Sequence, residues 1–102
     1  FADAPVYVLG SRATFSAAEE FAYDLQALGR ARVVGEVTRG GANPGAIHRL
    51  DAHFAVFIPD ARAINPVTGD NWEGGGVSPD VPCAADDALG VARALALEAI
   101  RN

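Results

Sequence analysis

The stretch PVYVLGSRATFSAAEEFAYDLQALGRARVVGEV, residues 5–37, decides the fold of this chain of 102 residues. Its first five residues form an apolar run that ends at a glycine, which is typical of a buried strand. From Ser16 to Leu28 the spacing is helical, and Gly29 follows as a stop signal. One face, expected to be buried, carries the apolar residues Ala18, Phe21, Ala22, Leu25 and Leu28, while Glu19, Glu20, Asp24 and Gln26 lie mostly on the other faces. A second apolar run, Ala31–Val37, predicts another strand. Strand, helix and strand in this order predict an α/β fold.

Shorter elements are expected in the rest of the chain. From periodicity and turn residues we predict a loop over 38–45, a hairpin or two adjacent strands over 46–50 and 53–58, a short strand over 62–64, a loop over 65–82 and a helix over 86–100. No internal repeat or linker is visible in the sequence. We therefore expect residues 1–102 to form a single domain or part of one.

The composition excludes several kinds of function. A net charge of −5 argues against a nucleic-acid binder, which needs a basic face. No apolar run reaches the roughly 18 residues of a membrane-spanning helix. The eight basic residues are all arginine, so Schiff-base chemistry, a Walker-type phosphate site and a Ser–Lys dyad are excluded within these residues. The single cysteine, Cys83, is expected to pack as a small side chain.

The segment Thr14–Glu19 places a serine where a loop opens into the predicted helix. The pattern Ser-x-x-Glu has two interpretations. In the commoner one it is a capping box, in which Ser16 and Glu19 satisfy free amides at the helix start. In the other, Ser16 is a nucleophile at the positive end of the helix dipole, and the amide of Ala17 stabilises an oxyanion. The residues alone leave both interpretations open.

A second candidate segment is the glycine-dense stretch NWEGGGVSPD, residues 71–80. Glu73 in such a loop can orient a catalytic imidazole, or it can be a solvated glutamate in a surface turn. His48 and His53 are five positions apart, an odd spacing that places them on opposite faces of a single strand. No further ligands stand at a recognisable spacing, so neither a metal site nor a cofactor is expected.

Three segments carry a family resemblance in the order that the family has them. They are TFSAAEEF (14–21), VGEVTRGGA (34–42) and WEGGGVSPD (72–80). Together they resemble the C-terminal half of the peptidase domain of the tail-specific (carboxyl-terminal processing) serine proteases. The closer likeness is to the branch of interphotoreceptor retinoid-binding protein and the core of tricorn protease. The resemblance implies a ClpP/crotonase-like spiral of β-β-α units, present as a partial domain formed by the C-terminal part of a catalytic domain.

The resemblance also implies roles for three residues. Ser16 matches the nucleophile, and the amide of Ala17 matches a donor of the oxyanion hole. Glu73 matches the glutamate that supports a catalytic histidine through an intermediate hydroxyl in the tricorn-like branch.

The catalytic base is the point at which the chain departs from the family that it resembles. Processing proteases of the other branch use a lysine after the serine, whereas the matching loop here contains Gly40 and Gly41. In the tricorn-like branch the histidine lies upstream of the nucleophile, so His48 and His53 match no base position. Because the sequence does not begin with methionine, we expect a piece of a longer protein that carries nucleophile and acid without the base.

These inferences lead to a serine-type peptidase that hydrolyses peptide bonds by acyl transfer, with a peptide or protein as its partner. The alternative is a non-catalytic module of the same fold that binds an apolar ligand of the retinoid or fatty-acid kind; a non-catalytic interaction domain is a third reading. We expect the isolated chain to be catalytically silent. We also expect it to self-associate or to pack with a missing N-terminal part, since apolar strand surface would otherwise stay open. A periplasmic or extracytoplasmic location is compatible with the resemblance, but the sequence leaves the location open.

Overall fold

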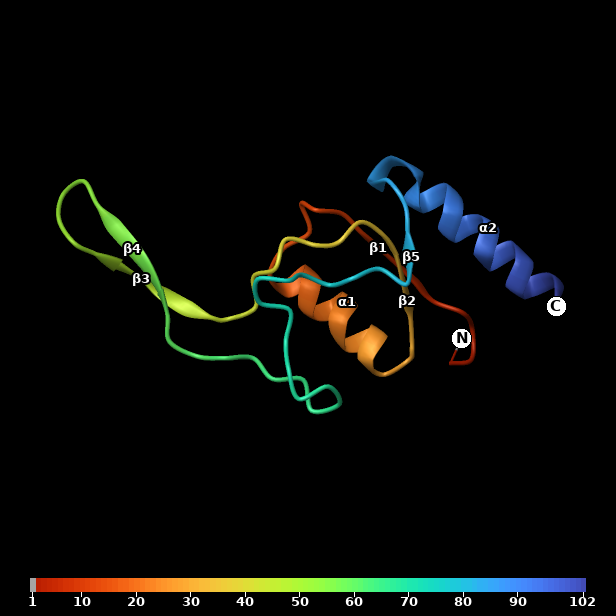
Figure 1. The fold of residues 1–102 in the computed structure, drawn as a ribbon, viewed down its shortest axis with the longest axis horizontal. Helices are drawn as coiled ribbons and strands as arrows, with labels where there is room; N and C mark the ends of the chain where they lie inside the picture. The colour runs from red at the N-terminus through yellow and green to blue at the C-terminus, as the bar shows by residue number, and fades with distance from the viewer. Residues whose placement is uncertain (1) are drawn as a thin grey trace.

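The computed structural model describes residues 2–102 and has the expected mixture of helices and strands (Figure 1). Its elements are β1 (Tyr7–Gly10), α1 (Ala17–Ala27), β2 (Arg32–Gly35), β3 (Gly45–Arg49), β4 (Ala55–Pro59), β5 (Val81–Pro82), the 3₁₀ turn η1 (Ala85–Asp87) and α2 (Ala88–Arg101). Three strands form a parallel sheet in the order β1-β2-β5, and β3 and β4 form a separate antiparallel hairpin. The α/β class predicted from the sequence is confirmed.

Strand β2 is the centre of the molecule because it is covered on both faces. Its consecutive residues Val33 and Val34 are both fully buried, and side chains that follow one another in a strand point to opposite faces. Val33 packs into one cluster with Ala22, Trp72 and Val77. Val34 packs into another with Ala88 and Ala92. Helices α1 and α2 therefore lie on opposite faces of the small sheet, as Figure 1 shows.

Helix α1 buries a different face from the one that its apolar spacing predicts. The stripe that includes Phe21 and Leu28 was expected to face the core, but these two side chains are 61% and 67% exposed. Ala22 is buried as predicted. Glu19 is buried as well, although the helical pattern placed it away from the core. The burial of Glu19 follows from the four hydrogen bonds that its carboxylate accepts.

The second half of the chain holds two differences from the predicted elements. Residues 62–64 form no strand. Strand β5 lies inside the stretch predicted as a loop, and it consists of two residues that pair with Val34 and Gly35. A strand of two residues has no alternation to detect, which is why the sequence pattern misses it. The predicted hairpin and both long helices are present, with ends shifted by a few residues.

The β3–β4 hairpin projects away from the sheet (Figure 1). Every residue of both strands is exposed, and the longest dimension of the molecule is 60 Å. Its register pairs Ile47 with Phe57 and His48 with Val56. The large apolar side chains exposed on the hairpin and its turn are Ile47, Leu50, Phe54, Val56, Phe57 and Ile58. Among residues 2–102 no helix is both long and apolar enough to cross a membrane.

Candidate active site

Ser16 stands at the turn between β1 and α1 in a conformation that few residues adopt. Its φ is 57° and its ψ is −123°, and within residues 2–102 it is the only residue other than glycine with a positive φ. A side chain in this region is strained, and such strain is concentrated at functional sites. Ser16 is exposed and directly precedes the first helical residue.

The amide of Ala17 is a free hydrogen-bond donor next to that hydroxyl. No acceptor for this N–H is found in the part of the chain that the structure describes. The next two amides of the helix, by contrast, are bonded to the carbonyl oxygens of Phe15 and Ser16 at 3.3 and 2.8 Å. An unpaired donor directly after an exposed serine is the arrangement that an oxyanion hole requires.

Glu19 is the buried centre of this region. Its side chain is fully buried, and its two oxygens accept four hydrogen bonds. Oε1 accepts from the Thr38 hydroxyl and the Gly40 amide, both at 2.6 Å. Oε2 accepts from the amides of Ser16 at 2.8 Å and Gly41 at 2.9 Å. Burial alone would raise the pKa of Glu19, but these hydrogen bonds outweigh it, so the pKa lies below its ordinary value.

Thr38 extends this network to the loop that carries Glu73. Its hydroxyl donates to Glu19 and accepts the Val77 amide at 2.7 Å, and both Thr38 and Val77 are buried. The approach depends on Gly76, which has a φ of 71° and whose added Cβ would stand 2.2 Å from the Thr38 carbonyl oxygen. The three segments that carry the family resemblance therefore meet at one buried hydroxyl and one buried carboxylate.

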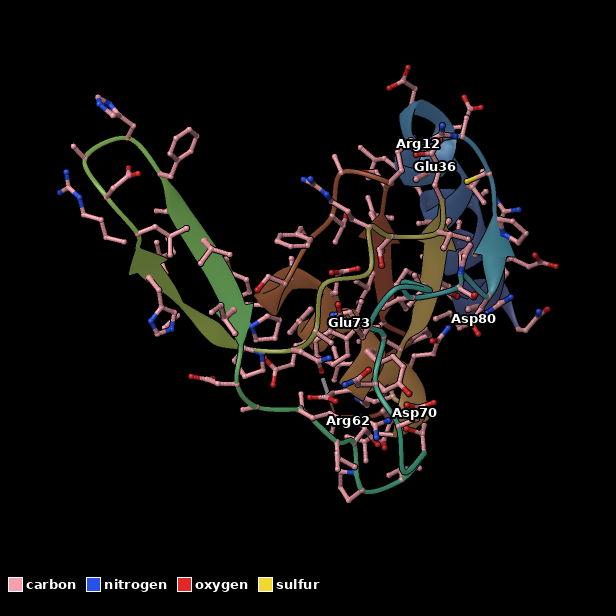
Figure 2. The ribbon with its side chains drawn as sticks, turned by 60° about the vertical axis from the view of Figure 1, so that its left-hand side comes forward. Arg12, Glu36, Arg62, Asp70, Glu73 and Asp80 are labelled. Atoms are coloured by element: carbon pink, nitrogen blue, oxygen red, sulfur yellow. The ribbon has the colours of Figure 1, made fainter. Side chains whose placement is uncertain are left out.

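Glu73 binds the glycine-rich loop 40–45, which Glu19 also contacts, from the solvent side. Its Oε2 accepts the amides of Ala42 at 2.7 Å and Asn43 at 2.8 Å. The bond from Asn43, and to a smaller extent the bond from Ala42, lowers the pKa of Glu73 below its ordinary value. Glu73 is exposed and lies between the hairpin and the sheet (Figure 2). It is therefore a fixed carboxylate rather than a freely solvated one.

Four consecutive amides, those of residues 40–43, thus donate to two carboxylates. The indole N–H of Trp72 adds a bond to the Gly41 carbonyl oxygen at 3.0 Å. This loop was predicted from its glycines alone, and nothing in that pattern indicated which side chains hold it. The only signal is the Ser-x-x-Glu motif, which predicts the bond from the Ser16 amide to Glu19 but none of the other three that Glu19 accepts.

One pocket of about 810 Å³ is lined by Ser16, Ala17 and Glu73 together. Its walls are residues 15–17 and Glu20 at the start of α1, the loop 40–45, Phe57 and Pro59 of β4, Ala63, Trp72 and Glu73. Most of this lining is apolar. The ion pairs Arg12–Glu36 and Arg62–Asp70, at 3.2 and 2.8 Å, do not belong to it and lie on either side of Glu73 in Figure 2.

Among residues 2–102, no histidine lines this pocket. His48 lies in β3, His53 lies in the hairpin turn, and both are exposed. Within residues 2–102 no group of three or more histidine, cysteine or acidic side chains is placed to hold a metal ion.

Gly41 is in direct contact with an aromatic ring, since a Cβ there would stand 2.0 Å from Phe15 Cε2.

Comparison with known proteins assigns these features to a family. The model of peptidase family S41 matches residues 1–83, a span that includes Ser16, the glycine-rich loop and Glu73. The chain belongs to peptidase family S41. Among solved structures, the photosystem II D1 C-terminal processing protease is similar, with 32% sequence identity and a TM-score of 0.66. That likeness covers 90% of this chain and 25% of the protease, so the chain spans about a quarter of that protein's length.

The S41 assignment confirms the resemblance to the tail-specific proteases on which the sequence interpretation depends. It leaves the finer expectations as predictions. Neither match decides between the tricorn-like branch and the processing-protease branch. The ClpP/crotonase-like spiral, the boundaries of the domain and the roles of Ser16, Ala17 and Glu73 likewise stay predictions.

Proposed function

We propose that this chain is the nucleophile-bearing part of a serine peptidase that cleaves peptide bonds by acyl transfer. The observation that carries the proposal is the strained, exposed Ser16 at the start of a helix, beside a free amide and inside a pocket. Membership of the S41 family and the similar processing protease support the same reaction. The substrate is a peptide or protein segment lying in the cleft between α1 and the hairpin.

In the proposed mechanism, Ser16 Oγ attacks the carbonyl carbon of the scissile bond while its proton passes to a general base. The Ala17 N–H donates to the oxygen that becomes negative. Collapse of this intermediate breaks the C–N bond, and the leaving amine takes the proton from the base. Water then repeats the sequence on the acyl-enzyme, releasing the acid product and restoring Ser16.

The base in this proposal is a histidine outside residues 1–102. The chain contains no lysine, and no histidine of the described residues 2–102 lines the pocket. A lysine at position 41, in the loop that matches the lysine position of the processing proteases, would require the Phe15 ring to move. This supports a base that comes from outside the loop. Glu73 would support that histidine with Oε1, since Oε2 is engaged by Ala42 and Asn43. We expect roughly 5–12 Å between the Ser16 and Glu73 side chains, room for an imidazole and a hydroxyl.

A non-catalytic apolar-ligand module is the second candidate. The observation that favours it is the apolar lining of the pocket, to which Phe15, Phe57 and Trp72 contribute. Such a module has no use for a strained serine, because a positive φ at a residue other than glycine lowers stability without improving apolar contact.

One experiment separates the two candidates. The complete protein that carries this chain is treated with a fluorophosphonate probe and assayed with a peptide substrate, beside its Ser16→Ala variant. We expect labelling of Ser16 and hydrolysis in the unmodified protein and neither in the variant. Hydrolysis that survives Ser16→Ala would exclude Ser16 as the nucleophile. Binding of a fluorescent fatty acid by both proteins, without labelling or hydrolysis, would favour the binding module.

A further inference from the structure

The Glu19 carboxylate is buried and charged, and it contacts Ser16 through the backbone rather than through the hydroxyl. We propose that Glu19 is a positioning residue, which holds Ser16 in its left-handed turn and so aims the hydroxyl and the Ala17 amide into the pocket. This inference rests on the proposed function, because it concerns the same serine. It adds a residue that touches neither substrate nor base in that mechanism.

The argument begins with what Ser16 would do without this contact. The residue before a helix ordinarily has β-region dihedral angles, whereas Ser16 has a φ of 57°. Relaxation to the ordinary conformation would turn the N–H of Ser16 away from its present direction. The bond from that N–H to Glu19 Oε2, at 2.8 Å, opposes this rotation directly.

Glu19 can oppose the rotation only because its own position is fixed at both ends. On the helix side it is in the first turn of α1, one turn before the buried Ala22. On the loop side its oxygens are held by Thr38, Gly40 and Gly41. The carboxylate therefore ties the strained turn to a loop that is itself fixed to β2 and to the Glu73 segment. The acceptor of the Ser16 amide is therefore fixed in place by its other three hydrogen bonds.

The charge matters because all four partners donate to Glu19. In a glutamine, one of the two oxygens becomes an NH₂ group. Placed at the Oε1 position, NH₂ faces the Gly40 amide, and placed at Oε2 it faces the amides of Ser16 and Gly41. Either orientation sets donor against donor at one or two buried amides, so Glu19→Gln releases part of the network without changing the side-chain size.

The test compares Glu19→Gln with Asp80→Asn in the complete protein. Asp80 is the control for neutralising a carboxylate outside the pocket: it is exposed, and it accepts the amide of the buried Val33 at 2.7 Å and a bond from Gln26 at 3.0 Å. We expect Glu19→Gln to lower both kcat and the rate of fluorophosphonate labelling about 100-fold, as misplaced reacting groups do, and to leave KM nearly unchanged. Asp80→Asn should leave kcat unchanged, because Asp80 does not line the pocket and the asparagine carbonyl oxygen can accept both bonds.

A second readout does not depend on catalysis. A positive φ places the amide and α hydrogens of a residue close together, so Ser16 should show a strong intraresidue NOE between them in the unmodified protein and in Asp80→Asn. We expect this NOE to weaken in Glu19→Met, whose side chain has a similar length but no oxygen to accept the Ser16 amide. If Glu19→Gln does not fold, Glu19→Asp is measured instead; its side chain is one methylene too short to reach both Ser16 and the loop, and the same losses are expected.

The outcomes separate this inference from the proposed function. An unchanged NOE, or equal losses of kcat in Glu19→Gln and Asp80→Asn, would overturn the positioning role. If the unmodified protein neither reacts with the probe at Ser16 nor hydrolyses peptide, the proposed function fails, and with it the catalytic meaning of the contact. The NOE would then still decide whether Glu19 holds the turn.

Discussion

Removing the Thr38 hydroxyl while keeping the shape of the side chain should destabilise the protein strongly. Thr38 is buried, and its hydroxyl makes two bonds, to Glu19 at 2.6 Å and from the Val77 amide at 2.7 Å. In Thr38→Val both bonds are lost. The bond to the charged carboxylate is worth about 1.5–3 kcal/mol, and leaving the Val77 amide unpaired in a buried position costs about 1–3 kcal/mol more. The sum is about 2.5–6 kcal/mol.

Thr38→Ser is the control for this substitution. It keeps the hydroxyl and removes one methyl group, which costs about 0.5–1.5 kcal/mol. We therefore expect Thr38→Val to be less stable than Thr38→Ser by at least about 1 kcal/mol, although valine preserves the packing better. A hydrophobic account of this position, in which β2 and its neighbours are held by apolar contact alone, predicts the opposite order.

The measurement is urea unfolding followed by the fluorescence of Trp72. It is the only tryptophan of the chain, is 5% exposed, and packs in the same cluster as Val77. Thr38→Val should shift the midpoint with an unchanged slope, so that the shift reports stability. Equal stabilities for the two variants, or a more stable Thr38→Val, would refute the reasoning that the buried hydroxyl holds the site together.

Two further predictions concern the same loops. Gly76→Ala should be strongly destabilising, because its φ of 71° is strained for alanine, by about 1–3 kcal/mol, and its Cβ would stand 2.2 Å from the Thr38 carbonyl oxygen. Gly75→Ala, where a Cβ meets no atom within 4 Å, should stay within about 0.5 kcal/mol of the unmodified chain in the same urea titration. The second prediction concerns acid. The pKa values of Glu19 and Glu73 are below the ordinary 4.5, so the stability that they contribute is present above that pH and is lost as the pH falls through their lowered values. Urea midpoints should therefore fall from about pH 5 downward, and Glu73→Gln should flatten part of that fall; an identical pH dependence in the variant would contradict the loop-anchoring role of Glu73.

The α/β class, the two long helices and the hairpin follow from the sequence because each has a periodicity that its own residues determine. Val33 and Val34 illustrate the point, since they lie in an apolar run that predicts a strand, and the structure shows this strand covered on both faces. The apolar stripe of α1 is a less reliable guide. Phe21 and Leu28 lie at the predicted spacing and are nevertheless largely exposed. Spacing identifies a helix, but which face is buried depends on the elements that pack against it.

The sequence identifies individual residues of the candidate site but not the hydrogen bonds that join them. The sequence predicts that Ser16 and Glu73 are candidates, and the pocket contains both. It does not predict that Glu19 is buried, because its partners at Thr38, Gly40 and Gly41 lie 19 to 22 positions away and three of its four bonds come from backbone amides. A backbone amide has the same chemistry at every residue except proline, so no residue type marks it as a future donor.

The strain at Ser16 and the burial of Glu19 explain one another in energetic terms. The sparsely populated conformation of Ser16, with φ 57° and ψ −123°, costs a residue other than glycine about 1–3 kcal/mol, and an exposed turn with no anchor would relax. A hydrogen bond to a charged acceptor contributes about 1.5–3 kcal/mol, so the bond from the Ser16 amide to Glu19 is sufficient to hold the turn. Burying a carboxylate is in turn unfavourable unless its oxygens are satisfied, and the bonds from Thr38, Gly40 and Gly41 supply the remaining partners. The two interpretations of Ser-x-x-Glu are therefore compatible, because the contact that caps the helix is also the one that keeps the proposed nucleophile in its strained conformation.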